Sequence, residues 1–223
     1  MARIARVVVP GVPHHVVQRG NRRQPVFFRD ADYELYVGLV SEWCRKYAVE
    51  VWAYCLMPNH VHLIAVPDTA LGLARAVGEA HRRYTQLVNQ RERWTGYLWQ
   101  GRFSSYPLDE PHLLMAVRYV EQNPVRARIV RLPWKYPWSS AAAHVSGQDD
   151  RLVHVKPMLE LVDEDWPSYL AERTGEADNM LLRQHSRTGR PLGDTEFIET
   201  LEHELRRRIG LGKRGRPRKA SEK

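Results

Sequence analysis

The tripeptide His60-Val61-His62 places two imidazole side chains two residues apart. The surrounding residues are largely β-branched and aromatic, which indicates a strand, and alternate side chains of a strand point to the same face. His60 and His62 would therefore lie together while Val61 faces the core. Two imidazoles on one strand supply half of a divalent-metal site, although packed or solvated histidine pairs show the same spacing. The pair requires a third ligand and a substrate.

Tyr119 and Asn123 could complete such a site. They lie four positions apart in a segment with helical periodicity, so they share one face of a helix. Asn123 would stand at the helix C-terminus, where the carbonyl dipoles favour a cation, and its carboxamide oxygen could bind the metal. The phenol of Tyr119 could then attack a phosphodiester that the metal polarises. Spacing alone more often means that such a tyrosine packs in the core.

The hydrophobic pattern predicts the elements that would hold these side chains. Runs of β-branched and aromatic residues predict four strands, and apolar residues at helical spacing predict three helices. The order strand, helix, strand, strand, helix, strand is typical of an α+β fold, a ferredoxin-like antiparallel sheet with helices on one face. The predicted strands are 7–20, 49–57, 60–66 and 103–108, and the predicted helices are 30–46, 71–89 and 109–123.

The chain is predicted to have three parts. Residues 1–140 hold the sheet and the candidate site, residues 141–177 form a linker with a helical connector, and residues 178–223 form a separate small, helical and basic extension. The formal net charge is +8, and the stretch from Arg183 to Lys223 has twelve Lys/Arg against six Asp/Glu, so it carries most of the excess. This concentration of positive charge indicates a polyanionic partner.

The cysteine content and the hydropathy pattern bear on location. Cys44 and Cys55 are too few for a disulfide framework and lack the spacing of a metal site. Prolines interrupt the N-terminal residues before a signal-peptide core could form, and no stretch is long and apolar enough to cross a bilayer. We therefore expect a cytoplasmic location, a reducing compartment and no membrane partner.

Two segments combine arginine, amide and aromatic side chains, the mixture that holds single-stranded DNA by phosphate contact and base stacking. The first is the turn after the first strand, and the second is the aromatic loop before the fourth strand. A solvated basic loop with a core tryptophan would explain the same composition. The residues predicted to contact DNA here are Arg19, Asn21, Arg22, Trp99 and Arg102.

The C-terminal extension contains two further basic motifs. RTGRPLG includes Arg190, and KRGRPRK includes Arg214 and Arg216. The second motif resembles an AT-hook, whose arginines enter the narrow minor groove of A·T-rich DNA. A generic phosphate-binding tail fits equally well, and both interpretations place these three arginines on DNA.

Three motifs occur in the order found in one known family. MPNHVHLI at residues 57–64 resembles the signature of the HUH tyrosine transposases of the IS200-like type. WQGRF at residues 99–103 and YVEQNPVRA at residues 119–127 resemble the rest of that domain in the subgroup of REP-associated tyrosine transposases. The resemblance extends over about residues 9–140, which identifies residues 1–140 as the catalytic domain, and it favours a DNA-contacting role for Arg102.

The resemblance also implies a mechanism. In that family two histidines and a polar side chain one helical turn after the tyrosine bind Mg or Mn, and the tyrosine attacks DNA, leaving a 5′-phosphotyrosine link and a free 3′-hydroxyl. By position these residues are His60, His62, Asn123 and Tyr119. Insertion-sequence members usually have glutamine where this chain has the shorter Asn123. The implied substrate is single-stranded or hairpin DNA of repetitive palindromic elements.

Three other functions fit part of the pattern. A rolling-circle initiator or relaxase-type nickase also pairs two histidines with a tyrosine. A domesticated DNA-binding regulator could retain the site without cleaving DNA, and a metal-dependent hydrolase could use water in place of Tyr119. The oligomeric state is open because relatives include dimers that exchange the tyrosine helix. The long segment after Ser140 favours a monomer in which Tyr119 acts in cis.

Overall fold

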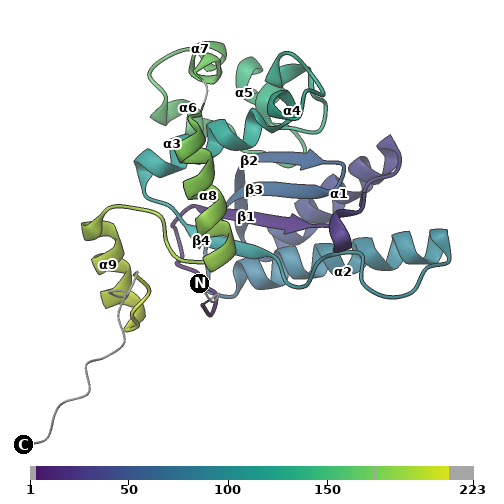
Figure 1. Cartoon of the computed structure of the whole chain (residues 1–223), viewed down its shortest axis with the longest axis horizontal. Coiled ribbons are helices and arrows are strands. Elements are labelled where there is room, and N and C mark those ends of the chain that lie inside the picture. The colour runs from purple at the N-terminus through teal and green to yellow at the C-terminus, as the bar shows by residue number, and fades with distance from the viewer. Residues whose placement is uncertain (1–3, 173, 211–223) are drawn as a thin grey trace, which may run out of the picture.

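A four-stranded antiparallel sheet lies at the centre of the chain in a computed structural model that describes residues 4–172 and 174–210 (Figure 1). The strand order is β2-β3-β1-β4, so β1 and β3 are the central pair. Helices follow β1 and β3, which confirms the predicted ferredoxin-like order of elements. The strands are β1 His14–Arg19, β2 Val49–Met57, β3 His60–Pro67 and β4 Ser104–Pro107.

One face of the sheet is covered by α1 (Asp30–Lys46) and α2 (Gly72–Glu92), as the sequence predicts (Figure 1). Val16 and Leu63 of the two central strands point to this side. They are fully buried and belong to one apolar cluster with Tyr36 of α1. This layer accounts for the larger part of the core.

The opposite face of the sheet is covered by α3 (Glu110–Glu121) and α8 (Glu176–Thr188), which pack over Ile64 and Tyr106. The prediction of helices on one face is therefore right for α1 and α2 but does not hold for the whole chain. The physical reason is that β3 is buried along nearly its entire length, and a strand that is apolar on both faces needs cover on both.

The segment after residue 178 does not form a separate unit in the part that the structure describes. Leu182 of α8 belongs to the same apolar cluster as Ile64, and Leu192 forms a bridge with Leu108. Val7 and Val9, predicted to begin the first strand, instead pack against α9. The remaining helical segments are η1 Asn21–Arg23, α4 Asn123–Arg126, η2 Pro133–Lys135, α5 Ala141–Ser146, α6 Lys156–Leu161, α7 Trp166–Ala171 and α9 Thr195–Leu205.

Glu121, the last residue of α3, is a fully buried carboxylate. It accepts hydrogen bonds from the Ser140 hydroxyl, from His144 Nδ1 at 2.7 Å and from Trp166 Nε1 at 2.8 Å. A buried carboxylate is tolerated only when such donors surround it. Because the donors belong to α5, α7 and the residue before α5, they fix the end of the helix that carries Tyr119.

Glu121→Ala should destabilise the protein, because it leaves the buried His144 and Trp166 donors without an acceptor, whereas the Ser140 hydroxyl can still donate to the Tyr54 carbonyl. Each orphaned donor costs about 1–3 kcal/mol, so we expect the free energy of unfolding to fall by roughly 2 kcal/mol or more. Glu121→Gln, which keeps one acceptor oxygen, should lose less. Urea titration measures both. Glu160→Ala, which removes an exposed carboxylate of α6, should change stability by less than about 0.5 kcal/mol, and an equal loss in both variants would contradict the role of Glu121.

A second buried polar group is His81 of α2, which lies on the other side of the sheet from Glu121. Its Nε2 hydrogen-bonds with the Tyr36 hydroxyl at 2.8 Å, and its ring stacks on Trp99 with centroids 4.6 Å apart. Burial lowers the pKa of His81 from 6.5 to about 3. The folded protein therefore keeps this ring neutral at a pH where the unfolded chain protonates it.

His81 should make stability depend on pH. Below pH 6.5 the unfolded state binds a proton that the folded state does not, so stability falls as pH decreases towards 3. Between pH 6 and pH 5, His81→Gln should flatten this slope by about 1 kcal/mol per pH unit, as measured by urea unfolding. Trp99→Phe perturbs the same cluster without removing a titrating group and should leave the slope unchanged. Parallel slopes for the wild type and His81→Gln would refute the assignment.

Candidate active site

His60 and His62 project from β3 on the face opposite α1 and α2, with ring centroids 5.1 Å apart. Tyr119 projects from α3 towards the same place, and its ring centroid lies 5.7 Å from that of His62. The structure therefore brings together the two histidines and the tyrosine that the sequence analysis singled out. Tyr119 is only 7% exposed, so its ring is held by packing while it faces the histidines.

A chain of hydrogen bonds fixes the orientation of His62. The Tyr106 hydroxyl donates to the carbonyl of Leu182, so its oxygen accepts from Nδ1 of His15 at 2.7 Å. Neutral His15 then accepts at Nε2 from Nδ1–H of His62, 2.8 Å away. This order of donors leaves Nε2 of His62 as an unprotonated atom with a free lone pair, which is the form of imidazole that binds a metal ion.

His60 is oriented in the same way from its other side. The Asn59 side chain donates from Nδ2 to the carbonyl of Arg23, which turns its Oδ1 towards His60. That oxygen accepts from His60 Nδ1–H at 2.6 Å, and His60 Nε2 accepts from the Asn123 carboxamide at 3.3 Å. Both histidines therefore present Nε2 lone pairs, and Asn123 lies beside one of them.

Both imidazoles are held neutral. The pKa of His60 is lowered to about 4, first by burial and then by the positive charges of Arg19 and Arg126. The pKa of His62 is well below its ordinary value because the ring is buried and because His60 and His15 lie close by. A neutral ring does not have to release a proton before it can bind a metal.

Asn123 lies in a different helix from the one predicted. The α3 helix ends at Glu121, Gln122 forms its C-cap, and Asn123 is the first residue of the short helix α4. The sequence predicts Asn123 as the last residue of a longer helix, because helical geometry is disfavoured before Pro124. The helix instead ends at Glu121. The spacing of one turn from Tyr119 is nevertheless kept, and the Asn123 side chain is buried next to His60.

Two neutral imidazoles and a neighbouring carboxamide form a donor set that fits a divalent metal. Among the described residues, no group of three or more His, Cys, Asp or Glu side chains is arranged to hold an ion, so a third protein ligand beside the two histidines would be of another kind. The Asn123 carboxamide is the one in place, and a half-turn about its last bond would present Oδ1 instead of Nδ2. Asn59 and His15 would act as the outer partners that orient the ligands.

Two residues that the sequence analysis did not assign to the site belong to it. His15 hydrogen-bonds His62 directly. Its strand position, on the same face as Val17, could have suggested this only with the β1–β3 register known. Arg126 stacks on Tyr119, with its guanidinium carbon 4.0 Å from the ring centroid. His14 is purely structural, because it bonds the backbone of Val12 and Val9.

The predicted DNA-contacting turn lies at the same end of the sheet as His60. Arg19 is the register partner of His60, and the next residue, Gly20, donates its amide to the Asn59 carbonyl at 2.8 Å. A Cβ at Gly20 would lie 2.2 Å from the carbonyl oxygen of Gln24, so only glycine fits. Arg22 and Arg23 then adopt positive φ angles of 53° and 62°.

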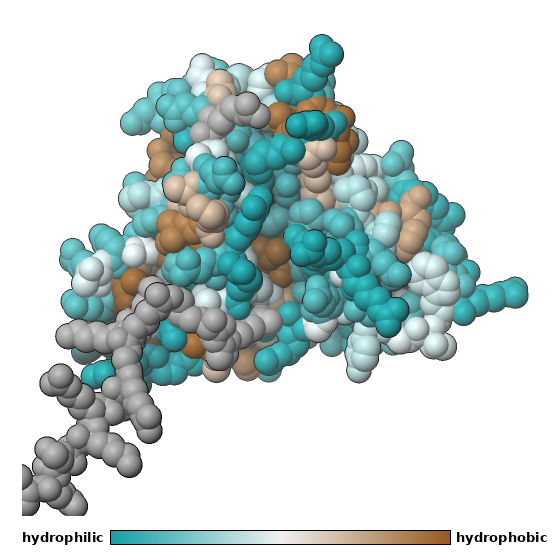
Figure 2. Space-filling view, in the orientation of Figure 1, coloured by the Kyte–Doolittle hydropathy of each residue, from teal (hydrophilic) through white to brown (hydrophobic). Residues whose placement is uncertain are grey.

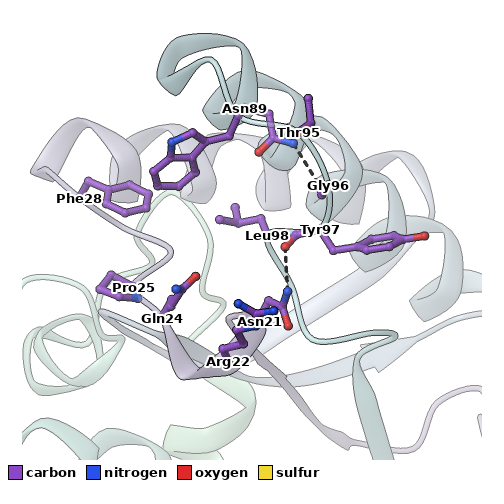
Figure 3. A pocket seen from close by; sticks show the side chains of 11 residues that line it. Asn21, Arg22, Gln24, Pro25, Phe28, Asn89, Thr95, Gly96, Tyr97 and Leu98 are labelled. Carbon is purple, nitrogen blue, oxygen red and sulfur yellow. Dashed lines mark hydrogen bonds between the residues drawn. The ribbon is translucent and has the colours of Figure 1, made fainter.

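A cavity of about 690 Å³ opens beside this turn, between it and the aromatic loop 94–98 (Figure 3). Asn21 and Arg22 line one side, and the loop is tied to the turn by the bond from Asn21 N to the Leu98 carbonyl at 2.8 Å. The exposed aromatic side chains around the cavity are Phe28 at 43%, Trp94 at 49% and Tyr97 at 88%. The cavity thus combines aromatic faces with amide and guanidinium groups.

Trp99 does not share this surface, contrary to its predicted role. It is 6% exposed and packs on His81, Tyr36 and Tyr84, so its ring is part of the core. Arg102 is exposed and lines a second cavity with Gln18. Trp99 is therefore the core tryptophan of the alternative interpretation given above. Trp94 and Tyr97 are the exposed aromatic residues of the loop.

Arg190 is engaged inside the protein. Its Nη1 donates to the carbonyls of Ile209 and Gly210, so this nitrogen is used within the protein and not for the predicted contact with DNA. Arg214 and Arg216 lie outside the described residues. Figure 2 shows a mostly hydrophilic surface with small apolar patches on the face of Figure 1, and no described helix is long and apolar enough to span a membrane.

Comparison with solved structures gives one match with the same fold and a second, weaker one. A complex of a REP-associated tyrosine transposase with a REP hairpin has a TM-score of 0.57 at 20% identity and covers 70% of this chain and 93% of that one. A transposase-like protein of Deinococcus radiodurans has a TM-score of 0.38 at 19% identity over 54% of this chain and 96% of that one. The first comparison supports the fold.

Sequence comparisons identify the family. A Haemophilus influenzae protein named as a REP-associated tyrosine transposase is 25% identical over 138 residues, which cover 56% of this chain and 71% of the relative. The family model described as IS200-like transposase matches residues 8–123, more than half of the chain, and this range contains His60, His62, Tyr119 and Asn123. The chain therefore belongs to the IS200-like transposase family.

Proposed function

We propose that this transposase is a metal-dependent single-stranded DNA endonuclease and strand transferase that acts on hairpins of repetitive palindromic elements through a phosphotyrosine at Tyr119. The observation that carries the proposal is the approach of the Tyr119 ring to His62, beside the two Nε2 lone pairs. The hairpin substrate is suggested by the REP hairpin in the solved relative and by the REP-associated name of the Haemophilus protein.

His60, His62 and Asn123 would hold Mg or Mn. The ion would supply Lewis-acid polarisation of the scissile phosphate. The chain itself contributes orientation: Asn59 and His15 keep the imidazoles in the tautomer that presents Nε2. The packing of α3 keeps the Tyr119 phenol next to them.

In the reaction, Tyr119 Oη gives up its proton to solvent and bonds to phosphorus, the bond from phosphorus to the 3′-oxygen breaks, and that oxygen takes up a proton from solvent. The products are a 5′-phosphotyrosine and a free 3′-hydroxyl. Joining reverses these steps, with a 3′-hydroxyl attacking the phosphotyrosine. Tyr119 lies beside His62 of its own chain, which favours a monomer that acts in cis. A cytoplasmic location accords with two free, buried cysteines.

The DNA strand would pass the turn 19–22 and the neighbouring cavity. Arg19 and Arg22 would contact phosphates, while Trp94 and Tyr97 offer exposed faces on which unpaired bases can stack. Arg102 and the C-terminal basic motif would extend the contact to the rest of the hairpin. The family match makes a rolling-circle initiator or relaxase the weaker alternative, and a non-cleaving regulator or water-dependent hydrolase is separated by experiment.

Tyr119→Phe should abolish covalent attachment. We expect wild-type protein, incubated with Mg or Mn and a labelled hairpin with single-stranded flanks, to form an adduct that resists denaturation. The Phe variant, His60→Ala and excess EDTA should each reduce adduct to background, because they remove the nucleophile or the metal. Gel electrophoresis under denaturing conditions measures the adduct.

The controls separate the alternatives. Tyr97→Phe, a change of another tyrosine hydroxyl outside the catalytic cluster, should retain adduct formation. Cleavage that continues without an adduct in Tyr119→Phe would favour the hydrolase. Binding without cleavage in the wild type, across hairpins with varied flanks, would favour the regulator.

Trp94→Ala combined with Tyr97→Ala should weaken binding of single-stranded DNA about tenfold or more, because base stacking on an aromatic ring contributes about 1–3 kcal/mol per base. Fluorescence anisotropy with a labelled oligonucleotide measures the change. Leu71→Ala removes an equally exposed apolar side chain at the other end of α2 and should have no effect. Unchanged affinity in the double variant would remove the cavity from the DNA path.

A further inference from the structure

Arg126 is a partly buried residue whose two terminal guanidinium nitrogens are buried donors. Its Nη1 and Nη2 atoms are both inaccessible to solvent, and neither has a hydrogen-bond partner among the described residues. The guanidinium lies over the Tyr119 ring, 4.0 Å from the centroid, and its recorded side-chain interactions are with this tyrosine. Unsatisfied buried donors are costly, so this arrangement is unfavourable until an anion reaches them.

Arg126 lies on the same short helix as Asn123 and against the ring of Tyr119. It is the last residue of α4, the helix that begins with Asn123. It lies on the Tyr119 ring, whose centroid is 5.7 Å from that of His62, and its positive charge contributes to the low pKa values of His60 and His62. The segment Asn123–Arg126 therefore brings one amide and one guanidinium to the place where Tyr119 faces the histidines.

Positive charge accumulates around Tyr119. Arg19 enters from β1 opposite His60, and its charge is favoured by the Tyr119 phenol and opposed by Arg183 of α8. Burial lowers the pKa of Arg126, and Arg183 lowers it further while Tyr119 acts in the opposite sense. Arg126 thus lies on the Tyr119 ring, and the charges of Arg19 and Arg183 act on the same region, so a phosphodiester would offset the mutual repulsion of these groups.

We propose that Arg126 is a catalytic residue whose Nη1 and Nη2 atoms donate to the non-bridging oxygens of the scissile phosphodiester during attack by Tyr119. This assignment rests on the function proposed above. As Oη bonds to phosphorus and the 3′-oxygen leaves, the phenol proton passes to solvent and the 3′-oxygen takes a proton from solvent. The negative charge on the non-bridging oxygens is stabilised by donors that are already in place.

Arg126→Ala should slow adduct formation about a hundredfold on a hairpin whose cleavage site has been mapped with wild-type protein. Hairpin affinity should change only a few-fold, because Arg19, Arg22 and the aromatic cavity remain. Arg131→Ala is the matched control, since it removes an exposed arginine of the following loop, and it should react at the wild-type rate. Arg126→Lys, which keeps the charge but not the paired donors, should lose about tenfold and tests the proposal if the alanine variant is unstable.

A methylphosphonate at the scissile position separates charge neutralisation from a structural role. It replaces one charged oxygen with a methyl group, in one of two diastereomers. Arg126→Ala, or Arg126→Lys in its place, should form adduct faster on at least one diastereomer than on the phosphodiester. A variant that matches the wild type on the phosphodiester, or that gains on neither diastereomer, overturns this inference alone. Absence of adduct in the wild type overturns the proposed function and this inference together.

Discussion

The register between β1 and β3 is the constraint on which the active site depends. Arg19 pairs with His60, Val17 with His62 and His15 with Ile64. This pairing sets His15 diagonally across from His62, where their ring nitrogens meet, and sets Arg19 beside His60. A slip of one residue would turn a whole strand over, so that the imidazoles would enter the α1/α2 core. Val61 and Leu63, which alternate with the histidines along β3, are buried in the α1/α2 core and oppose such a slip. The same alternation of side chains along β3 therefore specifies both the core and the geometry of the candidate site.

Most of the sheet could be predicted from the sequence because its signals are local. The hairpin around Pro58 and the helix from Asp30 to Lys46 follow from strand alternation, turn residues and helical spacing. The cover on the second face could not be predicted in the same way. The apolar side of α8 is short, and only its contact with Tyr106 and Ile64 shows that residues after 178 complete the core of the transposase domain.

Some residues of the candidate site could likewise be predicted from local sequence signals, and others could not. His60, His62 and Tyr119 were found because their spacing and the family motifs are written in consecutive residues. His15 and Arg126 act through partners far away in the sequence, and no local pattern distinguishes them from other histidines and arginines. Trp99 shows the opposite error: an aromatic residue next to an arginine resembles a stacking platform, but packing on His81 decides its place. Composition identifies candidate groups, and only tertiary contact assigns them.

The two consecutive left-handed residues Arg22 and Arg23 have a consequence for recognition. A non-glycine residue in this region costs of order 1 kcal/mol, and here the cost is met by bonds that hold the turn, from Asn59 to the Arg23 carbonyl and from Gln24 N to Asn21. The turn has thus already lost its conformational entropy when the protein folds. An oligonucleotide arriving at it would encounter a surface of fixed shape, and more of each contact would appear as affinity and as discrimination between strands of different geometry.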